Sequence, residues 1–161
     1  MKVVSNTSAV LNLALIGELS LLRRLFDEIV VPDAVQSELE VRLLKAGTTA
    51  ALAIPSWIQS RPVANRPVVD SLSLELDAGE AEAIALAVEM QADLVLLDER
   101  LARRVAGRLG LRFIGVLGVL VEAKRRGVIP LVKPVLDALL AKAGFWVGKP
   151  LYTRVLSEVD E

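Results

Sequence analysis

Acidic and amide side chains recur in this sequence where strand-like segments meet helix-like segments. Asn6 and Asp98 each follow a short β-rich run, whereas Glu38 and Glu80 lie early on predicted helices. In parallel α/β sheets, ligands bind outside the carboxyl ends of the strands, so we expect these side chains to gather there. Clustered carboxylates repel one another unless a cation neutralises them, and hard oxygen ligands suit Mg²⁺ or Mn²⁺. The pattern therefore predicts a site for one of these ions.

Each of these residues also has an ordinary structural interpretation. Asn6 and Asp98 are good N-cap residues for the helices that follow them. The segment 77–80 resembles a capping box, in which Glu80 folds back onto the cap. Glu38 can form an i,i+4 pair with Arg42. The sequence alone leaves both interpretations open at every position.

The composition excludes several kinds of catalysis. The chain of 161 residues has no cysteine and no histidine, so it cannot use a thiolate, a Ser-His-Asp triad or a histidine-ligated zinc. Any catalysis must rest on carboxylates, hydroxyls, Lys/Arg or a hard metal ion. The net charge is −1, so binding to nucleic acid requires a local basic patch.

The hydropathy is high, with 53% hydrophobic residues and a mean hydropathy of +0.50. No apolar run approaches the roughly 20 residues that cross a bilayer, and the first residues resemble a strand rather than an export leader. We therefore expect a cytoplasmic protein without a membrane partner. Strands buried on both faces and a subunit interface explain the apolar surplus, so we predict a homodimer or a higher homo-oligomer.

Short β-rich runs alternate with longer helical patterns, which favours an α/β protein with a central parallel sheet between helical layers. The length suggests one domain over residues 1–161, with a C-terminal helical tail from about residue 130. The segment Ala46–Asp70 is rich in turn residues and is predicted to be loose. The predicted strands are 2–5, 28–32, 92–98 and 111–115. The predicted helices are a pair within 11–26, then 33–46, 78–91, 99–109, 116–126 and 131–143.

Substrate contacts are predicted on the helix that follows Asp98. It carries a basic stripe at i, i+4 and i+8, which suits RNA phosphates or simply a solvated face: Arg100, Arg104 and Arg108. Its apolar positions are expected to pack on the sheet: Leu101, Val105 and Leu109. Glu82 lies about 200° around its helix from Glu80 and is expected at the surface, while Glu99 is a further acid beside Asp98.

Three aromatic residues, Phe145, Trp146 and Tyr152, lie close together in a chain that has few. Aromatic side chains of this kind anchor a tail or form an oligomer contact more often than they stack on bases. We therefore expect the first role, with base stacking as the alternative.

Four stretches of the chain resemble the PIN-domain nucleases, which include the VapC-type toxins. These stretches are VVSNTSAVLNLA, IVVPDAVQSEL, LDAGEAEAIALAVEMQADLVLLDERLARRVA and GFWVGKPLYTRVL. The third stretch is the most specific. The sequence is most similar to a less characterised PIN-like branch of bacterial and archaeal proteins.

The resemblance implies a three-layer α/β/α sandwich whose acidic residues hold Mg²⁺ or Mn²⁺ and hydrolyse RNA phosphodiesters. The catalytic and metal-binding acids of the family correspond to Glu38, Glu80 and Asp98. The first-strand aspartate corresponds to Asn6, a neutral ligand that is expected to weaken metal binding. Thr7 and Ser8 beside it are candidate substrate contacts.

Two functions follow from this resemblance. The first is a metal-dependent endoribonuclease, including the toxin of a toxin–antitoxin pair with an antitoxin protein as partner. The alternative is a catalytically weakened PIN-fold module that binds RNA or another protein, which Asn6 favours. A phosphoacceptor or nucleotide-binding domain is remote, because the sequence lacks a Gly-rich phosphate loop and the first strand lacks paired acids.

Overall fold

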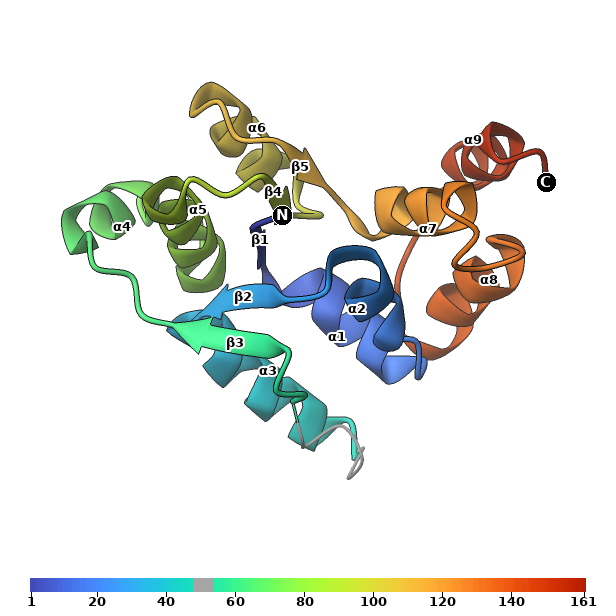
Figure 1. The fold of residues 1–161 in the computed structure, drawn as a ribbon, viewed down its shortest axis with the longest axis horizontal. Coiled ribbons are helices and arrows are strands. Elements are labelled where there is room, and N and C mark those ends of the chain that lie inside the picture. The colour runs from blue at the N-terminus through green and yellow to red at the C-terminus, as the bar shows by residue number, and fades with distance from the viewer. Residues whose placement is uncertain (48–53) are drawn as a thin grey trace.

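The chain folds around a five-stranded sheet in which all paired strands are parallel. The computed structural model describes residues 1–47 and 54–161. The strands are ordered β3-β2-β1-β4-β5, with β1 in the centre (Figure 1). Their bounds are β1 Val3–Ser5, β2 Ile29–Pro32, β3 Ile58–Arg61, β4 Leu94–Leu96 and β5 Phe113–Ile114. The predicted α/β fold with a central parallel sheet is confirmed.

The central strands are buried on both faces, as their continuous apolar runs predicted. Val3 contributes to one hydrophobic cluster and Val4 to the other. The same alternation separates Leu96 from Val95 on β4. Because successive side chains of a strand point to opposite faces, a strand packed on both sides must be apolar throughout.

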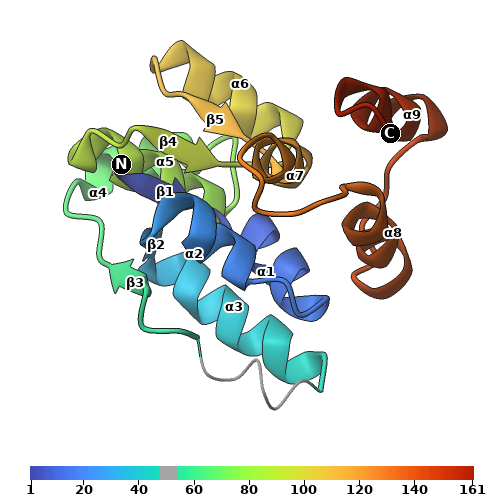
Figure 2. The same ribbon diagram turned by 45° about the vertical axis from the view of Figure 1, so that its right-hand side comes forward.

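Helices cover both faces and complete a three-layer arrangement. The cluster containing Val3 is packed by α1 Thr7–Leu15, α2 Ser20–Phe26, α3 Asp33–Lys45, α7 Val116–Arg125, α8 Lys133–Lys142 and α9 Lys149–Glu158. The cluster containing Val4 is packed by α4 Arg66–Leu72, α5 Ala78–Met90 and α6 Arg100–Arg108. In Figures 1 and 2, α4 and α5 lie on the opposite side of the strands from α7 and α8. In the part of the chain described, no helix has the length and apolarity needed to cross a membrane.

The strand order creates a switch point between β1 and β4. The chain first builds outward from β1 to β2 and β3, then returns to the other side of β1 for β4 and β5. In open α/β sheets, the crevice at such a reversal is where ligands bind. The Asn6 N–H donates to the Leu96 carbonyl at 3.1 Å, so the ends of β1 and β4 are held together.

Two predicted segments need correction. The loose segment Ala46–Asp70 contains β3 and the start of α4, while its residues 48–53 lie outside the described chain. Strand β3 was not predicted because only Ile58 of its four residues is buried, which leaves no apolar alternation. The first helix begins at Thr7, earlier than the predicted start near Leu11.

The packing face of α6 also differs from the prediction. Leu101 and Leu109 are 40% and 48% exposed, whereas Val105 is buried as expected. The other buried positions are small, Ala102 and Ala106. Small side chains permit close approach of α6 to the sheet, so the larger leucines are turned toward solvent.

We predict that Leu136→Ala destabilises the protein far more than Leu131→Ala. Leu136 on α8 is fully buried, whereas Leu131, just before the helix, is 48% exposed. A buried Leu→Ala change costs about 2–5 kcal/mol, and an exposed one about 0.5 kcal/mol or less. Urea denaturation gives both values. Equal effects would contradict the packing of α8 on the rest of the fold.

Candidate active site

The buried polar residues of the described chain lie around the carboxyl end of β1. Ser5, Asn6, Thr7 and Glu80 are each less than 9% exposed. Desolvating a polar or charged side chain costs free energy unless it gains a partner, so such residues are more informative than exposed ones. Three of them form the segment at which β1 passes into α1.

Asn6 occupies the N-cap position of α1, but its side chain forms no capping hydrogen bond. The amide oxygen instead faces Gly79, the second residue of α5. A Cβ atom on Gly79 would lie 3.4 Å from Asn6 Oδ1 and 3.2 Å from Glu38 Oε2. The missing side chain at Gly79 therefore lets α5 approach both oxygens. Among the described residues, the side-chain amide of Asn6 forms no hydrogen bond, and it is thus left uncommitted.

Glu38 reaches the same place from α3. Its Oε2 accepts a hydrogen bond from Thr7 Oγ1 at 2.8 Å, and its Oε1 lies 3.4 Å from Arg42. The predicted pair with Arg42 is therefore present. The hydroxyl of Thr7 is engaged by Glu38, so Thr7 orients this carboxylate.

Glu80 is fixed by a capping box at the start of α5. Asp77 accepts the Glu80 N–H at 2.8 Å, as the sequence suggested. Burial is the main cause that raises the pKa of the Glu80 carboxyl to about 7, and neighbouring Asp77 and Glu99 add to the effect. A nearby cation would reverse this shift by favouring the ionised form.

Asp98 has one engaged oxygen and one free oxygen. Its Oδ1 accepts the Val116 N–H at the start of α7 at 2.9 Å and lies 3.9 Å from Arg103. Its Oδ2 is buried without a hydrogen-bond partner among the described residues. Burial raises the pKa of Asp98, against the lowering effect of the Val116 N–H and Arg103. Asp98 thus binds the N-terminus of α7, while the cap position of α6 falls on Glu99.

Arg103 is a site residue that the sequence analysis did not select. Its Nε donates to the Leu97 carbonyl at 2.8 Å, and its guanidinium lies 5.9 Å from the centre of the Phe113 ring. A Cβ atom on Gly115 would collide with both Arg103 and Asp98. The sequence places this arginine five positions after Asp98, but helical spacing sets it outside the stripe of Arg100, Arg104 and Arg108.

Glu99 is a further acid of this site. It raises the pKa of both Glu80 and Asp98, so its charge acts on both carboxyls. The structure thus places Asn6 and Glu38 together at the carboxyl edge of the sheet. Glu99 lies within electrostatic reach of the other two acids, Glu80 and Asp98.

Glu82 is not the surface residue that its helical position predicted. Its side chain is only 12% exposed and lies 3.2 Å from Arg66. It also accepts the Ala34 N–H at 3.2 Å. Glu82 therefore joins α5 to the first turn of α3 and to α4, where helix packing covers the face that was expected to meet solvent.

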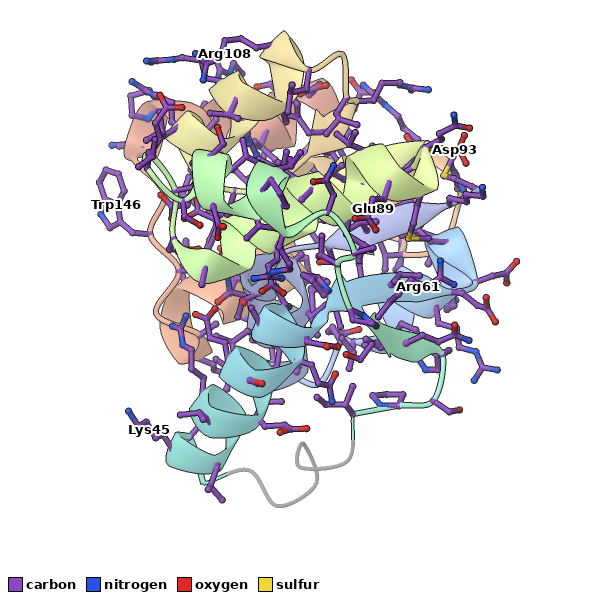
Figure 3. The ribbon with its side chains drawn as sticks, turned by 90° about the vertical axis from the view of Figure 1, so that its left-hand side faces the viewer. Lys45, Arg61, Glu89, Asp93, Arg108 and Trp146 are labelled. Carbon is purple, nitrogen blue, oxygen red and sulfur yellow. The ribbon has the colours of Figure 1, made fainter. Side chains whose placement is uncertain are left out.

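The three arginines of the predicted stripe are exposed, but their surroundings differ. Arg108, labelled in Figure 3, lies 3.1 Å from Glu75 and is thus already paired. Arg100 lines a cleft of about 720 Å³ between β5, α7 and α9, which we call the basic cleft. Arg112 and Arg154 also line it. Within residues 1–47 and 54–161, the guanidinium groups of Arg100, Arg112 and Arg154 form no ion pair or hydrogen bond.

A second hollow, of about 500 Å³, opens at Asp98 and Glu99. We call it the site groove. Its other polar lining residues are Ser8 and Asn12 of α1, Arg42 of α3 and Arg103 of α6, and the segment 143–147 lines it together with Leu117 and Leu151. Arg103, Leu117 and Leu151 line both hollows, so the site groove and the basic cleft are neighbours.

The oxygen atoms of this site are of the chemical kind that a hard divalent cation prefers as ligands. It offers carboxylate and amide oxygens, including the buried and unpartnered Asp98 Oδ2. Among the described residues, no three acids are close enough to form a complete ligand group by themselves. Mg²⁺ usually keeps several waters and takes one or two carboxylates, so a smaller set of protein ligands is compatible with it.

Comparison with known proteins identifies one family. A family model described as a PIN domain matches residues 2–161. The comparisons with curated proteins and with solved structures gave no match.

We predict that stability falls as pH rises through the titration of Glu80. Its pKa is raised from 4.5 to about 7, so between these values the folded chain holds a proton that the unfolded chain has lost. Glu80→Gln keeps a capping side chain but removes this proton. We therefore compare the free energies of unfolding of Glu80→Gln and wild type without divalent ions. The advantage of Glu80→Gln should grow by on the order of 2 kcal/mol between about pH 5 and about pH 8.

Urea denaturation across this pH range measures the effect. The control is Glu82→Gln on the same helix, which keeps Glu80 and should therefore keep the wild-type slope. An unchanged slope in Glu80→Gln would refute the assignment.

Proposed function

Because the chain belongs to the PIN-domain family over residues 2–161, we propose that it is a metal-dependent endoribonuclease that hydrolyses RNA phosphodiesters. One observation carries the proposal: Asp98 presents a buried, unpartnered carboxylate oxygen at the β1–β4 switch point. Glu80, Glu99 and the uncommitted amide of Asn6 accompany it. Glu80 is buried with only acids, Asp77 and Glu99, among the charged groups that shift its pKa, so a ligand that neutralises these acids is the simplest reason for the arrangement.

The proposed reaction divides the work among these side chains. Asp98 and Glu80 would hold the ion together with Asn6, while Glu38 is kept in place by Thr7 and Arg42. When bound, Mg²⁺ or Mn²⁺ supplies a nucleophile and neutralises charge on the phosphate.

Glu80 is the best candidate for proton transfer. The chain has no histidine, so a carboxylate must accept this proton, and an ion bound nearby would keep Glu80 in the ionised form that can accept it. The carboxylate would accept a proton from the attacking water as the water oxygen bonds to phosphorus. One P–O bond to the leaving nucleotide then breaks.

The substrate would enter along the site groove. Ser8 is available there for a phosphate or a 2′-hydroxyl, and Arg103 lies beside Asp98. Arg100 and Arg104 extend the basic surface from the start of α6. Arg108 is the least suited of the stripe because Glu75 already pairs with it.

A second candidate is a PIN-fold module that binds RNA or protein but has lost efficient catalysis. Asn6 favours it, because an amide replaces a carboxylate at the position nearest β4 and so removes one negative charge from the ion site. The two functions share a fold and differ only in the affinity for the ion.

A role as the toxin of a toxin–antitoxin pair is part of the nuclease proposal and is supported by the family alone. In that case an antitoxin protein would block the site groove in a cytoplasmic complex, and the chain would act as a homo-oligomer. Growth arrest on induced expression, relieved by Asp98→Asn, would support this role.

We predict that purified protein cleaves single-stranded RNA with Mg²⁺ or Mn²⁺ and that Asp98→Asn lowers the rate at least about 100-fold. Asp27→Asn is the matched control. Asp27 is exposed and precedes β2, at the amino ends of the strands and so opposite Asp98, and it lines neither the site groove nor the basic cleft. It should retain near wild-type activity. Cleavage by Asp98→Asn at the wild-type rate would refute the assignment, and cleavage only after Asn6→Asp would favour the weakened module.

We also predict that Asn6→Asp tightens Mn²⁺ binding by about tenfold or more. An added unit charge beside a divalent ion is favourable by roughly 2 kcal/mol even with water-like screening. Without the ion the same change should lower the melting temperature, because Asn6 is only 5% exposed. Calorimetric titration and thermal unfolding measure the two effects. An unchanged Mn²⁺ affinity would remove Asn6 from the ligand set.

A further inference from the structure

We infer that Trp146 is a nucleobase-binding residue, on which one base of a single-stranded RNA stacks as the strand enters the site groove. This inference deepens the proposed nuclease function and rests on it for the identity of the substrate. The starting observation is the exposure of the Trp146 side chain, which packing does not explain.

Trp146 is 84% exposed, although tryptophan is usually largely buried in folded proteins. Its neighbours Phe145 and Val147 pack against the hydrophobic core, so the chain turns only the indole outward. Tyr152 also packs inward and donates a hydrogen bond to Asp137 at 2.6 Å. The anchoring role expected for the three aromatics therefore fits Phe145 and Tyr152, but not Trp146.

The segment that carries Trp146 is held at both ends. The Phe145 N–H donates to the Leu139 carbonyl of α8 at 3.3 Å, and α9 begins at Lys149. A Cβ atom on Gly148 would lie 3.5 Å from the indole ring, so the edge of the ring rests on this glycine. An aromatic ring that is already positioned loses little conformational entropy when a ligand binds to its face.

Trp146 lines the site groove together with Asp98 and Glu99. Figure 3 shows the indole standing off one edge of the molecule, on the side opposite Asp93 and the amino end of β4. The groove also carries the guanidinium groups of Arg42 and Arg103. It thus combines an aromatic face, two cations and the acids of the proposed ion site.

This combination matches a single strand of nucleic acid. Base stacking on an aromatic ring requires an unpaired base with a free face, which a duplex does not offer. The phosphates need cations, and the basic cleft next to the groove supplies three arginines without partners in the described structure: Arg100, Arg112 and Arg154. The strand would therefore run from Trp146 past Asp98 toward the basic cleft.

The test uses Trp146 as its own reporter. The chain has two tryptophans, so in a Trp57→Phe background the indole of Trp146 is the only one that fluoresces. An oligouridylate of about 10 nucleotides is titrated in Ca²⁺, which replaces the active ion during binding. Stacking should quench the fluorescence of Trp146 as the RNA binds.

Affinity is then compared by fluorescence anisotropy of labelled RNA. Trp146→Ala should weaken binding by roughly 5- to 150-fold, and Trp146→Phe by much less, because stacking on an aromatic ring is lost only in the first. The salt dependence of binding should stay the same, since Trp146 neutralises no phosphate. Leu74→Ala is the control, because Leu74 is a similarly exposed apolar residue, 87% exposed, between α4 and α5.

The outcomes separate this inference from the proposed function. RNA cleavage by wild type with equal RNA affinity in Trp146→Ala would overturn the inference and leave the nuclease standing. Quenching and weakened binding without cleavage would support the inference and count against catalysis. A shift of oligomeric state in Trp146→Ala, with unchanged RNA affinity, would assign the indole to a contact with a second copy and overturn the inference.

Discussion

The site depends on the pairing of β1 with β4, two parallel strands whose carboxyl ends are bonded side by side. Ser5 lies opposite Leu96, and the next N–H along the chain, that of Asn6, donates to the Leu96 carbonyl. This register fixes where the two polar turns emerge. The strand order then leaves a crevice at the same place, because the connections leave β1 in opposite directions. Helices α3 and α5 approach this point closely because Gly79 has no side chain to separate them from it.

The proposed ion site rests on electrostatic features that helix capping does not explain. Capping accounts for Asp77 and for the engaged oxygen of Asp98. It does not account for the other oxygen of Asp98, the unengaged side-chain amide of Asn6 or the raised pKa of Glu80. Each of these carries a cost that a divalent cation would offset. In the proposed site, Asp98 would therefore use one oxygen for the N-terminus of α7 and the other for the ion.

The C-terminal helices contribute part of the lining of the site groove. Lys124 of α7 bonds the Glu161 carboxylate at 2.9 Å, and Glu161 accepts the Val132 N–H at 2.7 Å, so α7, α8 and α9 are tied together. The segment 143–147, between α8 and α9, lines the same groove as Asp98. Asp98 and the segment 143–147 lie far apart in the sequence and share no pattern. The groove that they line together could therefore not be predicted from the sequence alone.

The sequence by itself determined the layered α/β fold, since continuous apolar runs and helical patterns follow directly from local geometry. It also determined that polar residues follow β1 and β4, and the capping box at Asp77. Only the tertiary structure decided that β3 completes the sheet, that Glu82 is mostly covered by neighbouring helices, and that Arg103 joins Asp98 while Trp146 is left outside. The physical reason is that periodicity reports which face of an element is buried. What lies against that face depends on contacts between residues far apart in the chain.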